Sequence, residues 1–497
     1  MLPYKTLIHL DRAKTQPLYL QLVNRLIDLI QAAHLQAGKK LPGSRQMASL
    51  LEIHRKTVIQ AYDELYAQAW IDIIPYKGTF VAQNLAMVQA KRLAVKDSLY
   101  FPQKAGYEIL RTADEMIIHS PEMRKGGEKL SFDEGFPDLR LAPAKELSIT
   151  YARVLRRQSQ RNLLGYGEAA GALELRSILA LQLNETRGLK CKPKHILITR
   201  GSQMAIYLSA LALIKPGDGV IVGETSFYIA NRIFHLLGAK LHYIPVDKHG
   251  LCVEDIHLIC QKHSIRVLYL TSHHHHPTTV TLVPERRLQL LNLAQLYGFA
   301  IMEDDYDYDF HYANSPILPL ASADTHGHVI YMGSFSKTTA PAFRVGYIVA
   351  PEDLIRYLKQ LRLLIDRQGD STMELAFAEL LEAGIIRRYL KKALNVYHNR
   401  RDLCCDLLQK HLGEYISFDV PDGGMAIWVR FDPAIDMVKL SKEASKRGLH
   451  ISDGKKYNPI NQALNASRLG FASMNSEELR EAVHILEETL RFLNVQK

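Results

Sequence analysis

Cysteine is scarce in this sequence of 497 residues, and its five cysteines are Cys191, Cys252, Cys260, Cys404 and Cys405. The number is odd and no CxxC spacing occurs, so a disulfide framework and a structural zinc site are both disfavoured. Long apolar runs are also lacking, since no stretch approaches the roughly 18 apolar residues of a membrane-spanning helix. The N-terminus shows neither the apolar core nor the cleavage signal of a secretory leader. We therefore expect a cytoplasmic protein with free thiols and no membrane partner.

The composition is that of a globular protein, with 47% hydrophobic and 23% charged residues. At 497 residues the chain is too long for one hydrophobic core, which suggests two or three domains. The net charge of +10 permits an anionic partner such as DNA. Residues 1–84 carry ten Lys or Arg against six Asp or Glu, a modest indication that such a partner binds near the N-terminus.

Residues 1–82 have the pattern of a small helical domain that ends in a hairpin. The spacing of apolar residues predicts three helices, over 17–33, 45–51 and from position 54 or 55 to 69. Ser44 is expected to cap the second helix. Residues 71–81 predict a short hairpin with a basic tip, which would form a wing. A helix, a turn and a second helix can place that second helix in a DNA major groove.

This segment resembles the winged helix-turn-helix domain of GntR-type regulators, in the order and spacing of PLYLQL, LPGSRQMA, HRKTVIQAYDEL and KGTFVA. The resemblance implies binding to double-stranded DNA. Phosphate contacts give affinity and base contacts give specificity. The DNA-binding residues implied are Arg45, Arg55 and Lys77 at the phosphates, Lys56 and Thr57 close to the bases, and Gly78 and Thr79 in the wing.

The head departs from the family pattern at three turns. Glu52 and Ala69 stand where the family usually has glycine, and His54 stands where it usually has a capping serine. We expect each departure to weaken a local turn without removing a DNA contact. Residues 83–130 then lack a sustained apolar period and predict a linker, with a helical portion near 108–118.

From residue 131 onward, short apolar runs alternate with helical segments. This alternation predicts an α/β domain over 131–497, with a mainly parallel sheet covered on both faces. The large part is expected over 131–350 and a smaller C-terminal part over 390–497. Strands are predicted over 195–199, 219–223, 240–244, 266–270, 299–303, 328–332, 345–349 and 426–430. Helices are predicted over 144–157, 171–187, 202–214, 228–237, 284–297 and 476–494, and in most of 351–412.

Lys337 lies in a loop of small residues between two predicted strands. Burial disfavours an ammonium and favours a neutral amine, which is a nucleophile towards aldehydes. Ser334, Ser336 and Arg344 supply the hydroxyls and the fixed cation that hold a phosphate monoester. An aldehyde that carries a phosphate suggests pyridoxal 5′-phosphate (PLP). The alternative, from this loop alone, is that Lys337 is a solvated lysine and Arg344 an ordinary ion-pair partner.

Four further motifs follow predicted strands, at the sheet edge where phosphate ligands bind. Residues 199–203 open a helix whose backbone N–H groups can hold a phosphate, and Ser202 is also a plain helix cap. The acidic cluster 303–309 offers a carboxylate for a pyridine nitrogen and a tyrosine for a ring oxygen, although acidic runs are usually solvated. An aromatic residue within 225–228 can stack on a ring. His273–His276 invite a metal reading, but neighbouring side chains diverge, and we predict no metal.

In these motifs and their order, residues 131–492 resemble fold-type I aminotransferases, and with the head the chain resembles the MocR subfamily of regulators. The resemblance implies that Lys337 binds the PLP aldehyde covalently as the catalytic residue. Asp304 would pair with the pyridine nitrogen, and Tyr306 would reach the phenolic oxygen. Phe227 would stack on the ring. The phosphate would be held by Ser202, Gln203, Ser334, Ser336 and Arg344.

The same resemblance implies a homodimer and an effector site. Tyr166 would reach the phosphate of the neighbouring subunit, and Arg468 would receive a substrate or effector carboxylate. His276 stands near the ring oxygen, where aminotransferases place an asparagine. Thr279 replaces a glycine, and Ile229 replaces the arginine of a GABA-responsive relative.

The leading hypothesis is a PLP-dependent transcriptional regulator that senses an amine, an amino acid or PLP. A working aminotransferase with a DNA-binding head, and a non-catalytic interaction protein with a degenerate pocket, are the alternatives.

Overall fold

The fold is seen in a computed structural model, which describes residues 3–12, 16–83, 129–160, 164–312, 317–458, 460 and 464–495. The chain divides into two units, residues 1–110 and 111–497, and each is described by itself. Most of the predicted linker, including its helical portion at 108–118, lies outside the described residues. No helix in the described ranges is long and apolar enough to span a membrane.

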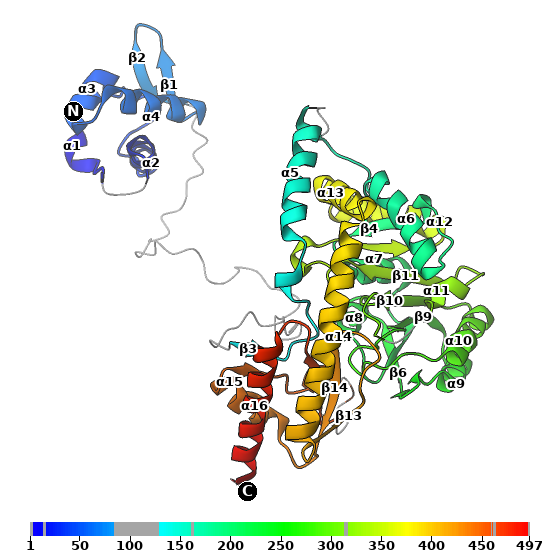
Figure 1. Cartoon of the computed structure of the whole chain (residues 1–497). Coiled ribbons are helices and arrows are strands. Elements are labelled where there is room, and N and C mark those ends of the chain that lie inside the picture. Colours follow the sequence, from blue (N-terminus) through cyan, green and yellow to red (C-terminus); the bar gives the residue numbers. More distant parts are fainter. Residues whose placement is uncertain are drawn as a thin grey trace. The chain divides into compact units, whose positions relative to one another are not determined.

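The first unit is a small helical bundle with a two-stranded hairpin (Figure 1). Its elements are α1 (Tyr4–Leu7), α2 (Leu18–Gln31), α3 (Ser44–Leu51), α4 (Arg55–Ala67), β1 (Ile71–Ile74) and β2 (Gly78–Val81). The core gathers around Leu26, Met47, Val58 and Leu65, which are fully buried. Strands β1 and β2 pair antiparallel. The winged helix-turn-helix fold predicted from the sequence is confirmed.

Two turns of this unit hold a non-glycine residue in the left-handed region. Glu52, which follows α3, has a φ of +53°, and Ala69, which follows α4, has a φ of +60°. A side chain in this region costs roughly 1–2 kcal/mol that glycine does not. Both turns are therefore strained, in keeping with the expectation that these departures weaken them.

The two helix starts differ from the sequence-based expectation. The cap predicted at Ser44 is wrong, because Gly43 is the cap residue of α3 and Ser44 is already helical. The Ser44 hydroxyl instead accepts a hydrogen bond from Arg55 Nε at 3.3 Å. His54 does cap α4, since its Nδ1 accepts from the backbone N–H of Lys56 at 3.2 Å.

The second unit is built around a seven-stranded sheet in the order β4-β12-β11-β10-β9-β5-β6 (Figure 1). The strands are β4 (Ile196–Thr199), β5 (Gly219–Gly223), β6 (Lys240–Ile244), β9 (Ile265–Leu270), β10 (Ala300–Asp305), β11 (Val329–Ser334) and β12 (Gly346–Val349). In this sheet β12 alone runs opposite to the other six strands. The mainly parallel sheet predicted from the sequence is therefore confirmed.

Helices cover both faces of the sheet because alternate strand residues point to opposite faces. One face, with Leu197 and Ile348, packs on α7 (Ser202–Leu213), α8 (Tyr228–Leu236) and α12 (Glu352–Ile365). The other face, with Ile198 and Leu268, packs on a larger group of helices. These are α5 (Ala144–Gln160), α6 (Leu173–Arg187), α9 (Glu254–Lys262), α10 (Pro284–Tyr297), α11 (Leu320–Ala323) and α13 (Ser371–Glu382).

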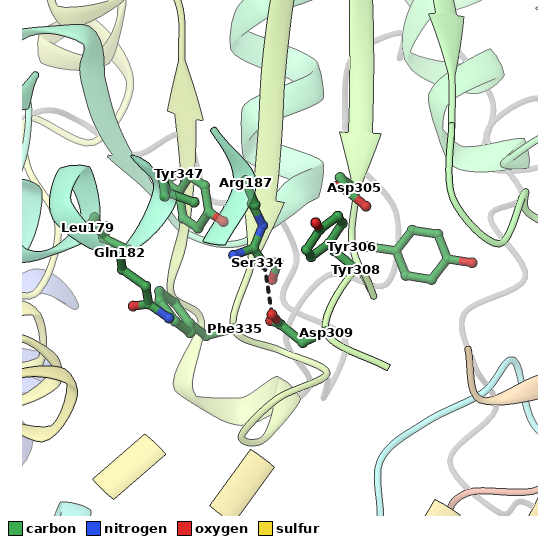
Figure 2. Close-up of a pocket in the computed structure, with 11 residues that line it drawn as sticks. Leu179, Gln182, Arg187, Asp305, Tyr306, Tyr308, Asp309, Ser334, Phe335 and Tyr347 are labelled. Atoms are coloured by element: carbon green, nitrogen blue, oxygen red, sulfur yellow. Dashed lines mark hydrogen bonds and ion pairs between the residues drawn. The ribbon is translucent and has the colours of Figure 1, made fainter. Parts of the chain in front are cut away.

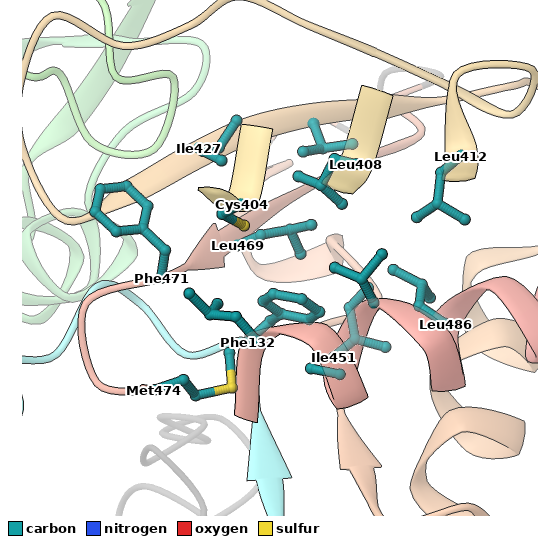
Figure 3. Close-up of a cluster of buried hydrophobic side chains, with 14 of the residues drawn as sticks. Phe132, Cys404, Leu408, Leu412, Ile427, Ile451, Leu469, Phe471, Met474 and Leu486 are labelled. Atoms are coloured by element: carbon teal, nitrogen blue, oxygen red, sulfur yellow. The ribbon is translucent and has the colours of Figure 1, made fainter. Parts of the chain in front are cut away.

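The C-terminal part has its own sheet and its own apolar core. Its elements are α14 (Ile385–Leu412), β13 (Ile416–Phe418), β14 (Ala426–Phe431), α15 (Met437–Lys446), β15 (Leu449–His450), β16 (Ala466–Gly470) and α16 (Ser476–Val495). Figure 3 shows the core, where side chains of α14, β14 and β16 meet those of α16 around Phe132, Leu469 and Phe471. Strand β3 (Leu130–Ser131) pairs with β15, so the chain just after the linker is anchored in this part. The hairpin of β7 (Val246–Asp247) and β8 (Gly250–Leu251) completes the second unit.

Candidate functional site

A cavity of about 380 Å³ lies where several strands of the large sheet end. Its volume falls within the range of about 300–1,000 Å³ that small-molecule sites occupy. Its described lining includes ten of the eleven residues predicted to bind the cofactor. These are Ser202, Gln203, Phe227, His276, Asp304, Tyr306, Ser334, Ser336, Lys337 and Arg344.

Lys337 follows β11 and its amine faces the cavity. Burial, opposed by the nearby carboxylate of Asp133, lowers the pKa of Lys337 to about 8. Lys337 Nζ donates to the Gly135 carbonyl at 2.6 Å and lies 4.6 Å from the ring centroid of Phe136. A considerable fraction of this amine is therefore neutral and nucleophilic near pH 8.

Asp304 lies at the end of β10 with its carboxylate buried beside the cavity. Oδ2 accepts a hydrogen bond from the Tyr269 hydroxyl at 3.0 Å, whereas Oδ1 has no partner among the residues that the structure describes. Burial raises the pKa of Asp304 to about 7, against the lowering effect of the Tyr269 hydrogen bond. A buried carboxylate oxygen without a partner is costly, and a cationic N–H donor at the cavity end of β10 would satisfy it.

Hydroxyls, backbone and an arginine converge at one end of the cavity. Gly201, with a φ of +84°, is the cap residue of α7, so the first N–H groups of that helix point towards the cavity end. A Cβ on Gly201 would lie 3.1 Å from the guanidinium of Arg344, so only glycine fits comfortably there. The hydroxyls of Ser334 and Ser336 are 2.9 Å apart. Helix N-terminus, hydroxyls and guanidinium are the groups that hold a phosphate.

Three rings stand around the middle of the cavity. The rings of Phe227 and His276 make an edge contact with centroids 5.3 Å apart, and Tyr306 lies 6.4 Å from His276. Burial lowers the pKa of His276 to about 4, so its ring is neutral. Its Nε2 donates to Glu134 Oε2 at 3.2 Å, which leaves Nδ1 as an acceptor without a partner in the described part of the chain.

Arg468 lies on β16, 1% exposed, and it is not among the described residues that line the cavity. Its guanidinium donates to the Pro277 carbonyl at 3.0 Å, the Tyr306 hydroxyl at 3.2 Å and the Glu134 carbonyl at 3.3 Å. The predicted carboxylate receptor therefore touches the site through Tyr306, and its own donors are already engaged by protein groups.

Tyr166 is the one predicted cofactor residue that lies away from this cavity. Its side chain is 77% exposed and stacks under Arg367, whose guanidinium carbon is 3.9 Å from the ring centroid. It lies on a surface loop between α5 and α6.

The four consecutive histidines diverge to separate partners. His273 meets Asp305, His274 meets Asp307, His275 meets Thr278 and His276 meets Glu134. Within the described ranges, no three His, Cys, Asp or Glu side chains are arranged to hold a metal ion.

A second cavity of about 10 Å³ lies behind the ends of β10 and β11, large enough for about one water molecule (Figure 2). The buried guanidinium of Arg187 crosses it to Asp309, with Nη2 and Oδ1 3.0 Å apart, and faces the Tyr308 ring. Tyr306 and Ser334 line both this small cavity and the larger one. At this volume the small cavity has no room for an organic ligand.

The sequence analysis missed several residues of the cavity lining. These are Glu134, Phe136, Tyr228, Thr271, Pro341 and Lys456. Thr271 adjoins a predicted motif and Tyr228 lies within the motif 225–228, so both could have been included by position. Glu134 and Lys456 come from segments without any periodic signal, one just after β3 and the other in a single 3₁₀ turn over Lys455–Tyr457.

The predicted DNA-binding residues of the first unit lie on α3, α4 and the hairpin. Arg45, Arg55, Lys56 and Lys77 are exposed, whereas Thr57, Gly78 and Thr79 are half-buried. The Arg55 to Ser44 hydrogen bond places the N-terminus of α4 beside that of α3. Two positive helix ends and several cations therefore lie together on this surface.

Residues 129–486, well over half of the chain, match the family described as Aminotransferase class I and II. The chain belongs to this family. Residues 18–81 match the family described as bacterial regulatory proteins, gntR family. The second unit is thus an aminotransferase domain and the first a GntR head.

Similar proteins share one or both parts. The probable rhizopine catabolism regulatory protein MocR of Rhizobium meliloti is 28% identical over 480 residues, 96% of this chain and 94% of that protein. The α-aminoadipate aminotransferase LysN of Thermus thermophilus, complexed with N-(5′-phosphopyridoxyl)-L-leucine, has a TM-score of 0.70 at 25% identity, over 75% of this chain and 94% of LysN. Kynurenine aminotransferase of Pyrococcus horikoshii, in complex with PMP, has a TM-score of 0.70 at 26% identity, over 79% of this chain and 97% of that protein.

The arrangement of a GntR head and an aminotransferase domain is that of the MocR-type transcriptional regulators. The family and the phosphopyridoxyl complexes of its structural neighbours imply pyridoxal phosphate as the cofactor. The residues present fit this group. The amine of Lys337 is partly neutral, and a buried oxygen of Asp304 has no partner among the described residues. The turn at Gly201 leaves space beside Arg344 that a Cβ would take up.

Proposed function

We propose that this MocR-type regulator binds PLP in the cavity at Lys337 and senses an amine, an amino acid or PLP itself there. The observation that carries the proposal is that Lys337 and Asp304, whose buried Oδ1 has no partner in the described part of the chain, line the same cavity. PLP supplies an aldehyde for covalent attachment and an electron-withdrawing ring. The protein is proposed to act in the cytoplasm, where the DNA bound by its GntR head lies.

Each lining residue has a proposed task in holding the cofactor. Lys337, as the catalytic residue, would hold the aldehyde carbon, and the Asp304 carboxylate would accept a hydrogen bond from the protonated pyridine nitrogen. Tyr306 reaches the phenolic oxygen, Phe227 stacks on the ring, and His276 borders the ring oxygen with its neutral imidazole. The phosphate is assigned to Ser202, Gln203, Ser334, Ser336 and Arg344, with Tyr166 of a second subunit completing it in a homodimer.

Arg468 is proposed to receive the carboxylate of an amino-acid effector. A bidentate carboxylate would replace the Pro277 carbonyl and Tyr306 hydroxyl as partners of its guanidinium. The exchange removes the Arg468 donor from the Tyr306 hydroxyl, which keeps its hydrogen bond to the His274 carbonyl, so effector binding changes the hydrogen bonds of a cofactor-holding residue. An effector acts only through different affinities for two arrangements of the protein.

Double-stranded DNA is proposed to bind the exposed cations of the head. Arg45, Arg55 and Lys77 meet phosphates, and Lys56 and Thr57 at the start of α4 approach base edges. Gly78 and Thr79 carry the wing against the backbone.

A second candidate function is a working aminotransferase with a DNA-binding head. The set of Lys337, Asp304 and Tyr306 in one cavity favours it. Steady turnover of an amino donor with a 2-oxo acid acceptor would support the enzyme, whereas a single spectral change without turnover would support the regulator.

The proposal is tested by reducing the PLP-loaded protein with borohydride and mapping the labelled peptide. We expect the label on Lys337, and no label in Lys337→Ala at equal PLP concentration. The variant should bind duplex DNA as the wild type does in the absence of effector, because the head folds around its own core. A label on another lysine, or equal labelling of the variant, would refute the assignment of the cofactor to this cavity.

A further inference from the structure

One wall of the cavity, residues 134–136, is made of groups that bind an ammonium. The Gly135 carbonyl accepts from Lys337 Nζ at 2.6 Å, and the Phe136 ring lies 4.6 Å from that nitrogen. A carbonyl dipole and the face of an aromatic ring both attract cations. A Lys337 nitrogen that is bonded to a cofactor is no longer an ammonium on this wall, so the wall is then open to another cation.

Glu134 adds a carboxylate to the same wall. Its Oε1 accepts from the Tyr457 hydroxyl at 2.6 Å and from the Lys456 ammonium, and its Oε2 accepts from His276. Although burial opposes ionisation, His276 and Lys456 hold the pKa of Glu134 well below its usual range. The cavity lining therefore contains a charged carboxylate that the cofactor assignment leaves unused.

Lys456 is an exchangeable partner of this carboxylate. Among the described residues, its ammonium contacts Glu134 and the ring of Tyr457, whose centroid is 5.2 Å from Nζ. The side chain is 17% exposed and sits in a single 3₁₀ turn, so its four-carbon stem can turn towards solvent. Glu134 would keep the hydrogen bonds of two neutral donors, Tyr457 and His276. The ammonium of a ligand can thus take the place of the Lys456 ammonium beside the Glu134 carboxylate, with no change in the net charge at that point.

A carboxylate at this wall is disfavoured by the same groups. Bound to Lys456, it would lie beside the charged Glu134 and be repelled. Ile229, which also lines the cavity, is apolar and offers no charge to a carboxylate. The described lining contains only Lys337, Arg344 and Lys456 as cations, and the first two serve the cofactor end in the proposed function. Arg468, the proposed carboxylate receptor, is not part of this lining and donates instead to the Glu134 and Pro277 carbonyls.

We propose that residues 134–136 form an ammonium-binding subsite, and that the effector carries a second cationic group, as a diamino acid with its carboxylate at Arg468 or a short diamine does. This inference rests on the proposed binding of an amine in the same cavity. One amino group faces the cofactor end at Lys337, and the second meets Glu134, the Gly135 carbonyl and the Phe136 ring.

The test uses full-length, PLP-loaded protein titrated with 1,4-diaminobutane, butylamine or 4-aminobutanoate, with visible absorbance as the readout. We expect the diamine to bind at least about tenfold more tightly than butylamine, the gain from one charge-assisted contact, and 4-aminobutanoate to bind more weakly than the diamine. Glu134→Gln should remove the preference for the diamine, because the amide keeps the size of the side chain and loses its charge. Lys456→Met should strengthen diamine binding by removing the competing ammonium.

The outcomes separate this inference from the proposed function. Equal affinities for diamine and butylamine, or an unchanged preference in Glu134→Gln, would overturn the subsite while leaving amine sensing intact. Tighter binding of 4-aminobutanoate that Lys456→Met weakens would assign the wall to a carboxylate and also overturn it. No response to any amine, with the absorbance of bound cofactor present, would overturn amine sensing and the subsite together. That absorbance also checks that each variant is folded.

Discussion

At the scale of single residues, Asp304 shows how the site is prepared at a cost to stability. Asp304 is buried with too few hydrogen-bond donors, which explains both why its Oδ1 has no partner among the described residues and why its pKa is raised. The folded protein holds a proton on Asp304 up to about pH 7, whereas the unfolded chain releases it near pH 4. The folded state therefore loses stability as pH rises between these two values.

Asp304→Asn should stabilise the cofactor-free protein above pH 7 relative to the wild type. The gain should grow from about pH 4 to about pH 7 and then level off, with a ceiling of about 4 kcal/mol. Urea unfolding of the apoprotein at a series of pH values measures it, and the exposed Asp419→Asn is the matched control. A variant that is less stable than the wild type at pH 8 would contradict the burial argument. The same variant should hold PLP more weakly, because an amide cannot keep the pyridine nitrogen protonated.

At the scale of elements, the GntR head carries exposed cations both at the start of α4 and on the wing. Arg55 lies at the first position of α4 and Lys77 in the turn between β1 and β2, and both side chains are exposed. Phosphates bound by such residues release counterions, so affinity depends on salt.

Arg55→Ala combined with Lys77→Ala should weaken binding to any DNA duplex and flatten its salt dependence. The slope of log affinity against log salt should fall in magnitude by about 2 for each head, one for each lost phosphate contact. Fluorescence anisotropy with a labelled duplex at several salt concentrations gives the slope. Lys248→Ala, an exposed lysine of the second unit, is the control and should leave the slope alone. An unchanged slope in the double variant would remove both residues from the interface.

The left-handed backbone of Glu52, in the turn after α3, predicts that a glycine at this position would stabilise the head. Glu52→Gly should stabilise the head by about 1 kcal/mol, because the left-handed backbone no longer carries a side chain. The exposed ion pair of Glu52 with Lys5 is lost, and such pairs contribute little. Ala69→Gly, which breaks no ion pair, should act in the same direction. Slower hydrogen exchange of the α2 and α4 amides in the full-length variants is the measurement, and faster exchange in both would contradict it.

The helices and long strands were predictable because their periods of apolar residues are strong. Strand 219–223 and helix 284–297 have the predicted bounds. The antiparallel direction of β12 and the helix α9 were not predicted, since direction leaves no mark in a buried strand and α9 buries only Ile256. The site residues that follow strands were found because strand ends meet at one sheet edge. Glu134 and Lys456 escaped because only tertiary folding brings residues 322 positions apart into contact.

At the scale of the whole molecule, the second unit exposes an apolar surface where its loop before α6 meets the end of α12. The backbone N–H of Gly167 donates to the Gln368 side chain, and Tyr166 stacks with Arg367. Leu164, Leu364 and Ile365 are exposed on the same two segments. Exposed apolar patches of this kind mark protein interfaces. A twofold dimer would cover the patch with its own copy and bring Tyr166 to the partner's cavity, as the aminotransferase resemblance implies.

Leu364→Glu should therefore shift the proposed homodimer towards monomer. Leu364 is 84% exposed in the single chain, so the change costs the monomer little, whereas a carboxylate buried in a twofold interface would be repeated and unpaired. Sedimentation velocity on the full-length protein measures the shift. Leu296→Glu is the matched control, because Leu296 on α10 is 67% exposed and should leave the dimer intact. Because Tyr166 would then no longer reach a second subunit, the monomeric variant should also release PLP faster than the control, and a dimer that persists in Leu364→Glu would place the interface elsewhere.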